Sequence, residues 1–373
     1  MPRIPLVDLK AQYSTIKSEI DSAIQRVLDS TSFILGSEVE NFERSFAEYI
    51  GTKGAVGVAS GTAALQLALE AFGIGRGDKV ITTAHTFFAT AEAIFRTGAE
   101  PVFVDIEERS YNIDPNLVEE SLKTDRRRDG RIRAVIPVHL YGRPAAMDAI
   151  MDIAARYDLR VIEDAAQAHG AEDGNKRCGA IGHLACFSFF PGKNLGAYGD
   201  GGAVTGNDDS LLQSIRKLRN HGRAKKYEHE IIGFGERLDA LQAAILSAKL
   251  PHLENWTEAR RSHARLYNRL LSNCDVIIPD EPEESRHVYH LYVIRTRRRD
   301  EMLAYLNSVG IGAGIHYPIP LHRQPACLKL GSSEVHLPVT EKIVNEIISL
   351  PMYPELTSDR IAYVAKAVEE FIK

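Results

Sequence analysis

Hydrophobic positions change their period along the chain. In the first fifty residues apolar side chains recur every fourth position, at Ile16, Ile20, Ile24 and Leu28, which predicts helices with one apolar face. From residue 54 onward, short apolar runs alternate with longer amphipathic stretches. The runs are GAVGVA (54–59), KVITT (79–83), PVFVD (101–105), RAVIPVH (133–139) and RVIED (160–164). The stretches expected to be helical are 62–72, 86–97, 114–122 and 146–157.

This alternation predicts an α/β fold. Strands that alternate with helices form a mostly parallel sheet with helices on both faces. In such sheets ligands bind beyond the carboxyl ends of the strands. We therefore look for chemistry where the apolar runs end.

A second, smaller domain is expected at the C-terminal end. A long helix is predicted from Leu238 to Leu270, with a break at Pro251, and the proline- and acid-rich stretch PDEPEES (279–285) follows it. We place the boundary there, giving domains 1–278 and 279–373. The tail is expected to hold a strand, a helix, a second strand and two terminal helices, which predicts a small α+β domain. Their expected ranges are 288–295, 299–308, 311–316, 338–348 and 357–371.

Composition narrows the function classes. The chain has 373 residues, 44% of them hydrophobic, and a net charge of -5, so no global basic field points to nucleic acid. Its four cysteines form no CxxC pair, and we expect free thiols in a reducing compartment and no metal. The start carries charges and lacks an apolar core, and no run approaches about 18 apolar residues. We expect a cytoplasmic protein that does not contact a membrane.

The sharpest candidate for chemistry is Lys193. It follows a strand-like run that ends at Phe190, after a Pro-Gly turn, and a glycine-rich segment continues to residue 204. A lone lysine is usually exposed. Between aromatic residues and glycines, however, desolvation would lower the amine pKa and free it to attack a carbonyl. This favours a lysine that forms a Schiff base with pyridoxal phosphate.

Pyridoxal phosphate needs a carboxylate at its pyridinium nitrogen. Asp164 ends the run RVIED, about thirty residues before Lys193, where a sheet binds its ligand. Its neighbour Glu163 should point to the other face of the sheet. The alternative is an ordinary loop-facing carboxylate.

The phosphate needs donors, and the ring needs a cover. Gly61 and Thr62 open a predicted helix directly after a strand, so free N–H groups there could hold an anion. The alternative is an ordinary helix cap. Ser188 could add a hydroxyl, and Phe87 is the candidate cover, although a lone aromatic residue would otherwise be assigned to the core.

The whole set resembles the DegT/DnrJ/EryC1/StrS sugar aminotransferases, which have the aspartate-aminotransferase fold (fold type I). The resemblance runs from IPLVDLKAQY to MYPELTSD, nearly the whole chain. Its specific blocks are ILGSEVENFE, ASGTAALQLAL, GDKVITTAHTFFATAEAI, PVHLYGRPAAMDAI, VIEDAAQAHGA, FSFFPGKNLGAYGDGGAV, RLDALQAAIL and GIHYPIPLHRQPAC. It implies a large, mixed but mostly parallel sheet domain, a small C-terminal α+β domain and a homodimer with shared active sites.

The resemblance also implies roles for residues. Lys193 matches the Schiff-base lysine and Asp164 the carboxylate at the pyridinium nitrogen. Gln167 matches the amide beside the ring hydroxyl. Gly61, Thr62 and Ser188 match the phosphate cradle, and Phe87 the residue that stacks on the ring. Arg237, His316 and Tyr317 match positions that line the sugar-nucleotide end of the site, partly from the neighbouring subunit.

One position departs from the family pattern. Relatives often carry an Asn two residues before the arginine of R-L-D, and that Asn reaches the cofactor phosphate across the dimer. Here the position is Gly235, which puts that contact in doubt. A dehydratase branch of the family replaces the lysine by histidine, and retention of Lys193 favours transamination.

The C-terminal block HYPIPLHRQPAC resembles the branch that aminates the third carbon of a keto-sugar. By this analogy we expect a nucleotide-linked keto-sugar, a dTDP-3-keto-6-deoxyhexose, with glutamate as donor. Alternatives are amination at the fourth carbon and a non-catalytic regulator on the same fold. An NAD-dependent epimerase is disfavoured, because GIGRGD (73–78) follows a helix instead of a strand and is better interpreted as a helix-ending turn.

Overall fold

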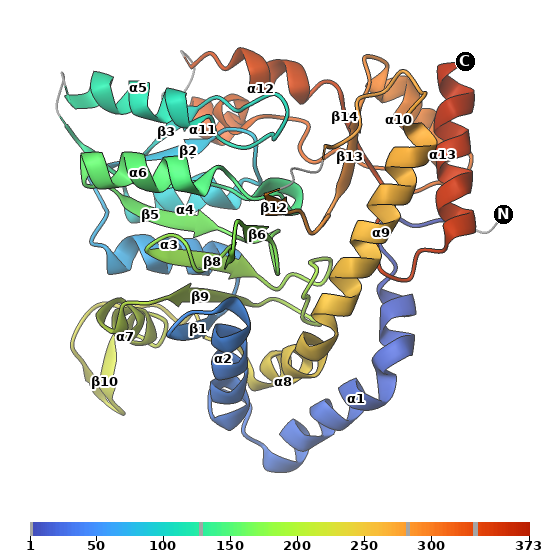
Figure 1. Cartoon of the computed structure of the whole chain (residues 1–373). Coiled ribbons are helices and arrows are strands. Elements are labelled where there is room, and N and C mark those ends of the chain that lie inside the picture. Colours follow the sequence, from blue (N-terminus) through green and yellow to red (C-terminus); the bar gives the residue numbers. More distant parts are fainter. Residues whose placement is uncertain (1–2, 127–129, 281–283, 331–334) are drawn as a thin grey trace.

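The computed structural model is built around a seven-stranded mixed sheet, and it describes residues 3–126, 130–280, 284–330 and 335–373 (Figure 1). The strand order is β1-β9-β8-β5-β4-β2-β3. Strand β9 runs antiparallel to both neighbours, and the other pairs are parallel. The strands are β1 (Gly54–Val58), β2 (Lys79–Thr83), β3 (Glu100–Val104), β4 (Ile132–Ile136), β5 (Arg160–Asp164), β8 (Leu184–Ser188) and β9 (Gly202–Gly206).

Helices cover both faces of this sheet, because successive strand residues point to opposite sides. One face carries α3 (Gly61–Ala71), α4 (Ala89–Thr97) and α7 (Asp209–Leu218). The other face carries α5 (Pro115–Arg126), α6 (Met147–Tyr157), α2 (Ser37–Ile50) and α8 (Ala240–Lys249). Ile162 lies in the core beneath α3, α4 and α7, whereas its neighbour Val161 lies in the core beneath α5 and α6.

The five expected strands and the four expected helices between them are confirmed, with shifts of a few residues at their ends. The long helix is confirmed as α8, a 3-10 turn η2 (Leu250–His252) at the proline, and α9 (Leu253–Leu271). The first helix, α1 (Leu9–Ser30), buries Ile16 and Ile20 but exposes 46% of Leu28. A four-residue spacing advances about 40° per step around a helix, so the buried stripe moves to Ala23 and Val27.

The C-terminal part holds a two-stranded antiparallel sheet, β13 (Tyr292–Arg295) with β14 (Ile347–Leu350), packed on α10 (Arg299–Ser308) and α13 (Ser358–Ile372). Two expectations here are wrong. Residues 311–316 form isolated bridges instead of a strand, and 338–348 divides into α12 (Pro338–Ile343) and the start of β14. The apolar stretch IISL finds a strand partner in 292–295, and that pairing overrides its helical pattern.

The extreme N-terminal segment joins this C-terminal part. Ile4 lies in the same core as α9, α10 and α13, and it forms a parallel bridge with Ile311, so the N-terminal segment lies beside the C-terminal part of the chain (Figure 1). The division after residue 278 stays a prediction, and residues 281–283 of the expected boundary lie outside the described residues.

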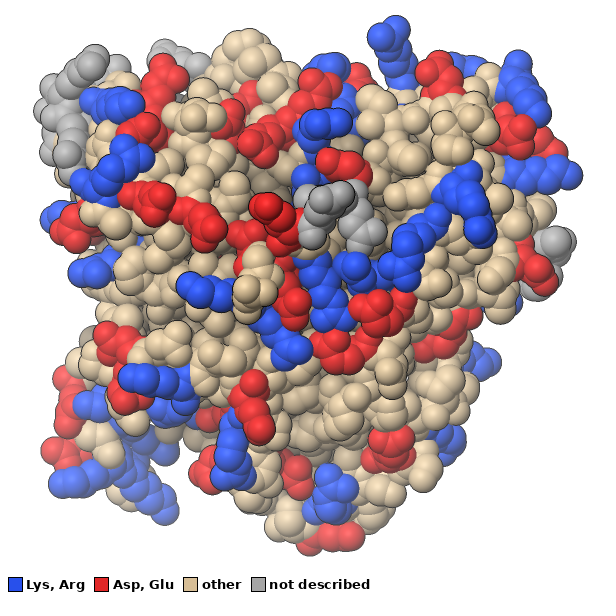
Figure 2. Space-filling model, viewed as in Figure 1, with Lys and Arg blue, Asp and Glu red and all other residues tan. Residues whose placement is uncertain are grey.

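Smaller elements complete the fold. They are β6 (Glu172–Asp173), β7 (Lys176–Arg177), β10 (Arg223–Lys225), β11 (Glu228–His229), β12 (Ser285–Arg286), η1 (Leu140–Gly142), η3 (Leu321–Arg323) and α11 (Pro325–Leu328). The segment 73–78 is a turn after α3, as expected, with Gly73 and Gly77 at positive φ. None of the helices described here combines the length and apolarity needed to span a bilayer. Figure 2 shows acidic and basic side chains interspersed on the visible face, without a field of one sign.

Candidate active site

The carboxyl end of β5 separates two acidic neighbours onto opposite faces of the sheet, as expected. Asp164 is buried on the α4 side, where its Oδ2 accepts a hydrogen bond from Thr90 at 2.8 Å and its Oδ1 accepts one from the Ala166 N–H at 3.2 Å. Burial raises the pKa of Asp164, and the bonds from Thr90 and Ala166 and the charge of Lys193 oppose that rise. A carboxylate so placed favours a cationic partner.

Lys193 lies in the loop after β8, the strand next to β5. Its backbone N–H donates to the carbonyl of Phe190 at 2.8 Å, which closes the turn. A Cβ on Gly196 would lie 2.3 Å from the carbonyl oxygen of Pro191, so only glycine lets the chain fold back this closely. Burial of the amine lowers the pKa of Lys193 to about 8, and the charge of Asp164 opposes this shift. About a tenth of the amine is therefore unprotonated at pH 7.

The start of α3 meets the end of β8. Ser60 caps the helix by accepting from the Ala63 N–H at 3.1 Å, and the N–H groups of Gly61 and Thr62 have no acceptor within the helix. A Cβ on Gly61 would lie 2.7 Å from the Cβ of Ser188. The helix start, with its positive dipole end, therefore lies directly against the Ser188 side chain, and this arrangement suits an anion.

Phe87 and Tyr317 meet on the other side of the site. Their ring centroids lie 5.6 Å apart, and 55% of Phe87 is exposed, so the core interpretation of this ring is wrong. Gln167 is buried, and its Nε2 donates to the Tyr317 hydroxyl at 3.1 Å. His316 precedes Tyr317, and its Nδ1 lies 2.8 Å from the Ser349 hydroxyl. Phe87, Gln167, His316 and Tyr317 are thus brought together.

Arg237 lies elsewhere in the same chain. It forms a bridge with Val58 at the edge of the sheet, and its guanidinium donates to Asn220 at 3.0 Å. Among the described contacts, none joins Arg237 to His316 or Tyr317. A Cβ added to the nearby Gly235 would lie 3.1 Å from the ring of the exposed His221. A side chain at 235 would therefore require the His221 ring to shift slightly.

Four residues near the site were not predicted as site residues. Thr90 follows Thr86 by four residues, and their hydroxyls lie 3.2 Å apart; this spacing was the available signal. Asn194 Oδ1 lies 3.3 Å from Nδ1 of the buried His290. Burial and the charge of Lys193 lower the pKa of His290 well below its usual range. Tyr141, the fourth, has partners so distant in sequence that no local pattern could reveal it.

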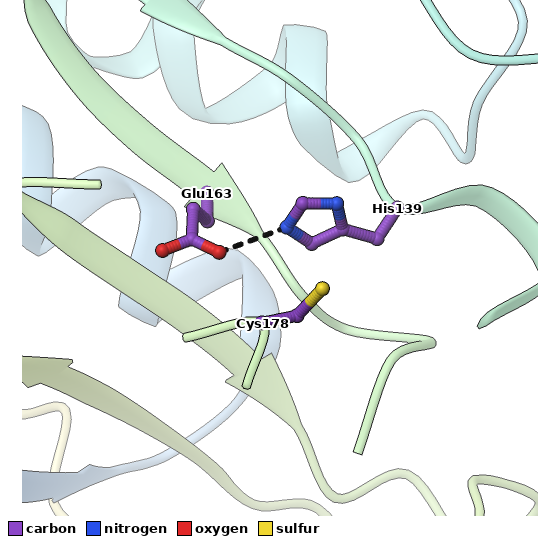
Figure 3. A group of neighbouring side chains, drawn as sticks. All are labelled: His139, Glu163 and Cys178. Carbon is purple, nitrogen blue, oxygen red and sulfur yellow. Dashed lines mark hydrogen bonds and ion pairs between the residues drawn. The ribbon is translucent and has the colours of Figure 1, made fainter. Parts of the chain in front are cut away.

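On the opposite face, Glu163 forms a group with His139 and Cys178, whose potential ligand atoms lie within 4.8 Å of one another (Figure 3). The carboxylate accepts from His139 Nε2 at 2.9 Å and from the N–H groups of residues 179, 181 and 182. His139 Nδ1 accepts from the Ala145 N–H. Protein donors thus already use the His and Glu atoms that a metal would need, and we interpret the group as a structural brace.

Comparison with known proteins covers nearly the whole chain. The model of the DegT/DnrJ/EryC1/StrS aminotransferase family matches residues 14–369. The chain is 48% identical to the "Pleiotropic regulatory protein" of Geobacillus stearothermophilus, over 99% of each chain. It is 45% identical to the dTDP-3-amino-3,4,6-trideoxy-alpha-D-glucose transaminase of Streptomyces venezuelae, over 99% of this chain and 96% of that one. The crystal structure of S. venezuelae DesV in complex with a ketimine intermediate superposes with a TM-score of 0.96 at 44% identity, covering 100% and 99% of the two chains.

Proposed function

The chain belongs to the DegT/DnrJ/EryC1/StrS aminotransferase family, and we propose that it transfers an amino group to a nucleotide-linked keto-sugar. It is a pyridoxal-phosphate-dependent aminotransferase with the fold of the sugar aminotransferases. The observation that carries the proposal is the amine of Lys193, with its low pKa, in the electrostatic range of the buried Asp164 at the carboxyl ends of adjacent strands.

The residues present fit pyridoxal phosphate. The free N–H groups of Gly61 and Thr62 and the hydroxyl of Ser188 suit its phosphate. Asp164, whose burial raises its pKa, would gain a counter-charge from a protonated ring nitrogen. Phe87 has an exposed ring that would cover the cofactor. The Gln167 amide, which donates to Tyr317, would contact the cofactor ring.

When bound, the cofactor supplies an aldehyde that condenses with amines and a ring that accepts an electron pair. The protein's residues do the rest. Asp164 would hold the proton on the ring nitrogen, and the hydrogen bond from Thr90 opposes the rise in the Asp164 pKa that burial causes. Lys193, with a pKa of about 8, would take a proton as base from the donor's amine-bearing carbon. As acid it would return that proton to the cofactor's aldehyde carbon, on the other side of the joining nitrogen. The reaction with the amino donor and the reaction with the keto-sugar take place one after the other at the same site.

For the substrate we propose a nucleotide-linked 3-keto-sugar, a dTDP-3-keto-6-deoxyhexose, with glutamate as amino donor. The similar S. venezuelae transaminase is named for a dTDP-3-amino sugar, which supports amination at the third carbon over the fourth. His316 and Tyr317, beside Gln167, are proposed to contact the sugar.

We also propose a homodimer with shared active sites. The segment around the β10–β11 hairpin carries large apolar side chains in contact with solvent: Tyr227 is 85% exposed, Ile231 42% and Ile232 93%. Exposed apolar side chains gathered in one segment mark interaction sites. Arg237, which has no described contact with His316 or Tyr317, would then serve a neighbouring subunit, as its family position implies.

The test is to incubate the purified protein with pyridoxal phosphate and glutamate, and then with a panel of dTDP- and UDP-linked 3-keto- and 4-keto-sugars. We expect 2-oxoglutarate in the first step and a mass-identified amino-sugar in the second. The Lys193→Ala variant should lose the near-visible absorbance of the lysine-bound cofactor and nearly all turnover. Full turnover in that variant would refute the assignment.

A second candidate is a regulatory protein, which the name of the G. stearothermophilus relative favours. A regulator needs no proton-transfer lysine, and here Lys193 and Asp164 influence each other's pKa as a base and a ring partner would. Absence of 2-oxoglutarate formation from glutamate in the loaded wild-type protein would favour the regulator.

A further inference from the structure

Tyr141 occupies an unusual place in the backbone. It lies in η1, directly after the carboxyl end of β4, with φ 60° and ψ 4°. This left-handed conformation is unfavourable for a residue that has a Cβ. Its side chain is buried. A strained backbone conformation persists only where the surrounding structure holds it. The contacts of Tyr141 should therefore show what the residue does.

The hydroxyl of Tyr141 joins two distant parts of the chain. It donates to the backbone carbonyl of His316, 175 residues later, and it lies 2.9 Å from Nε2 of His85. A carbonyl oxygen only accepts, so the hydroxyl proton of Tyr141 points to His316. His85 Nε2 must then carry a proton and donate it to the Tyr141 oxygen. The result is a directed chain from His85 through Tyr141 to His316, in which each bond polarises the next.

Both groups keep their protonation state at working pH. Burial lowers the pKa of His85 to about 4, although Asp105 opposes the shift. Burial raises the pKa of the Tyr141 phenol well above its usual value. His85 therefore stays neutral with one ring proton, Tyr141 keeps its proton, and the chain of bonds persists near neutrality.

A second route connects Tyr141 to Tyr317, the residue that follows His316. The Tyr141 N–H donates to Gln167 Oε1 at 2.6 Å, and Gln167 Nε2 donates to the Tyr317 hydroxyl at 3.1 Å. Tyr141 thus holds His316 through its side chain and Tyr317 through its backbone. On the far side, His316 Nδ1 lies 2.8 Å from Ser349 of β14. Tyr141 fixes the segment from the C-terminal part over the end of the large sheet.

We infer that Tyr141 is a positioning residue that holds His316 and Tyr317 over the site and so sets the affinity for the sugar substrate. This inference rests on the proposed function. The amino donor is smaller and needs the cofactor site, whereas the sugar is proposed to contact the segment that Tyr141 holds. Loosening the segment should therefore weaken sugar binding more than donor binding.

Tyr141→Phe tests the inference, and Tyr111→Phe is its matched control. Tyr111 is also buried and at positive φ, and its ring lies 5.8 Å from that of Tyr141, but its hydroxyl faces Arg295. The first measurement is hydrogen exchange of the peptide covering 313–319 in the loaded protein without substrate. Exchange should speed up in Tyr141→Phe and stay at the wild-type rate in Tyr111→Phe.

The second measurement follows loss of the near-visible cofactor absorbance with each of two amines. Glutamate and a dTDP-3-amino-3,6-dideoxyhexose, the product of the proposed reaction, both start from the same enzyme form. For Tyr141→Phe we expect the apparent dissociation constant to rise about tenfold for the amino-sugar, the size of one lost hydrogen bond, and to change less than about twofold for glutamate.

Unchanged exchange at 313–319, or equal weakening of both amines, would overturn the inference. If neither amine removes the near-visible cofactor absorbance of the wild type, the proposed function is overturned, and the claim about sugar affinity with it. If Tyr141→Phe does not fold, His85→Leu and His85→Gln replace it. Glutamine keeps a donor toward Tyr141 and should rescue the exchange rate and the sugar affinity that leucine loses; equal behaviour of the two would count against the chain of bonds.

Discussion

Thr90 Oγ1 lies 2.8 Å from Oδ2 of Asp164, and it donates a hydrogen bond to the carboxylate proposed to face the cofactor ring. This bond opposes the rise in the Asp164 pKa that burial causes. Thr90→Val keeps the shape of the side chain but removes the donor, so Asp164 should hold its charge less well. We expect kcat to fall about tenfold, as for loss of one hydrogen bond to a charged group. Thr90→Ser, which keeps the hydroxyl, should stay near the wild-type rate; equal losses in both variants would contradict the role.

The low pKa of Lys193 predicts how the empty protein takes up its cofactor. Only the unprotonated amine attacks an aldehyde. We compare the rate of cofactor attachment to Lys193 with the rate for free Nα-acetyl-lysine at the same pH. The ratio of the two rates should fall above about pH 8. Above that pH Lys193 is deprotonated and gains no further reactivity, whereas the free amine still does. Asp164 raises the pKa of Lys193, so Asp164→Asn should move this break to lower pH. A ratio that stays flat to pH 10 would show an ordinary lysine. Stopped-flow absorbance gives both rates.

Glu163 predicts a defined acid sensitivity. Burial would raise the pKa of this carboxyl, but hydrogen bonds from His139 and the loop N–H groups outweigh it and leave the pKa below 4.5. A group with a lowered pKa in the folded state stabilises above its unfolded pKa and loses that contribution as pH falls through the folded one. Glu163→Gln turns an amide toward backbone donors and should cost about 1–3 kcal/mol in the free energy of unfolding near pH 7. The difference should shrink below about pH 4, as measured by urea unfolding.

The hydrogen bonds within the group of His139, Glu163 and Cys178 predict that metal ions do not change the stability of the protein. Because protein donors already use the His139 and Glu163 atoms, dialysis against EDTA should leave the urea midpoint of the wild type unchanged, and added zinc should not raise it. A clear gain with zinc that Cys178→Ala abolishes would show that the group binds a metal.

The exposed Ile232 tests the proposed dimer. Ile232→Glu puts a charge on a side chain that is 93% exposed in the single chain, so the monomer should fold normally. If this segment is buried between subunits, the charge should raise the dimer dissociation constant at least tenfold and lower activity at dilution, as followed by sedimentation velocity. Ile277→Glu alters another half-exposed isoleucine, 52% exposed, and should leave the assembly intact. If both variants sediment as the wild type does, this surface is not the dimer interface.

The faces of the sheet that Glu163 and Asp164 occupy could be predicted from the sequence, because they depend on local alternation. The side-chain period of two places Glu163 and Asp164 on opposite faces, and their hydrogen-bond partners confirm it. Tyr141 was not predicted, since its partners His85 and His316 lie 56 and 175 residues away. Residues 347–348 were wrongly assigned to a helix for a related reason: the pairing of 347–350 with 292–295 decides their state, and no local period encodes a distant partner.

The pairing of the first residues with the last part of the chain has a consequence for biosynthesis. Ile4 exchanges backbone hydrogen bonds with residues 310 and 312, and Met352 donates to Leu6. On the ribosome, the first segment made must wait for nearly the last before it can dock. Contacts of such long sequence separation slow folding, so the nascent chain spends most of its synthesis with one end undocked, and a fusion partner at that end would compete with the closing step.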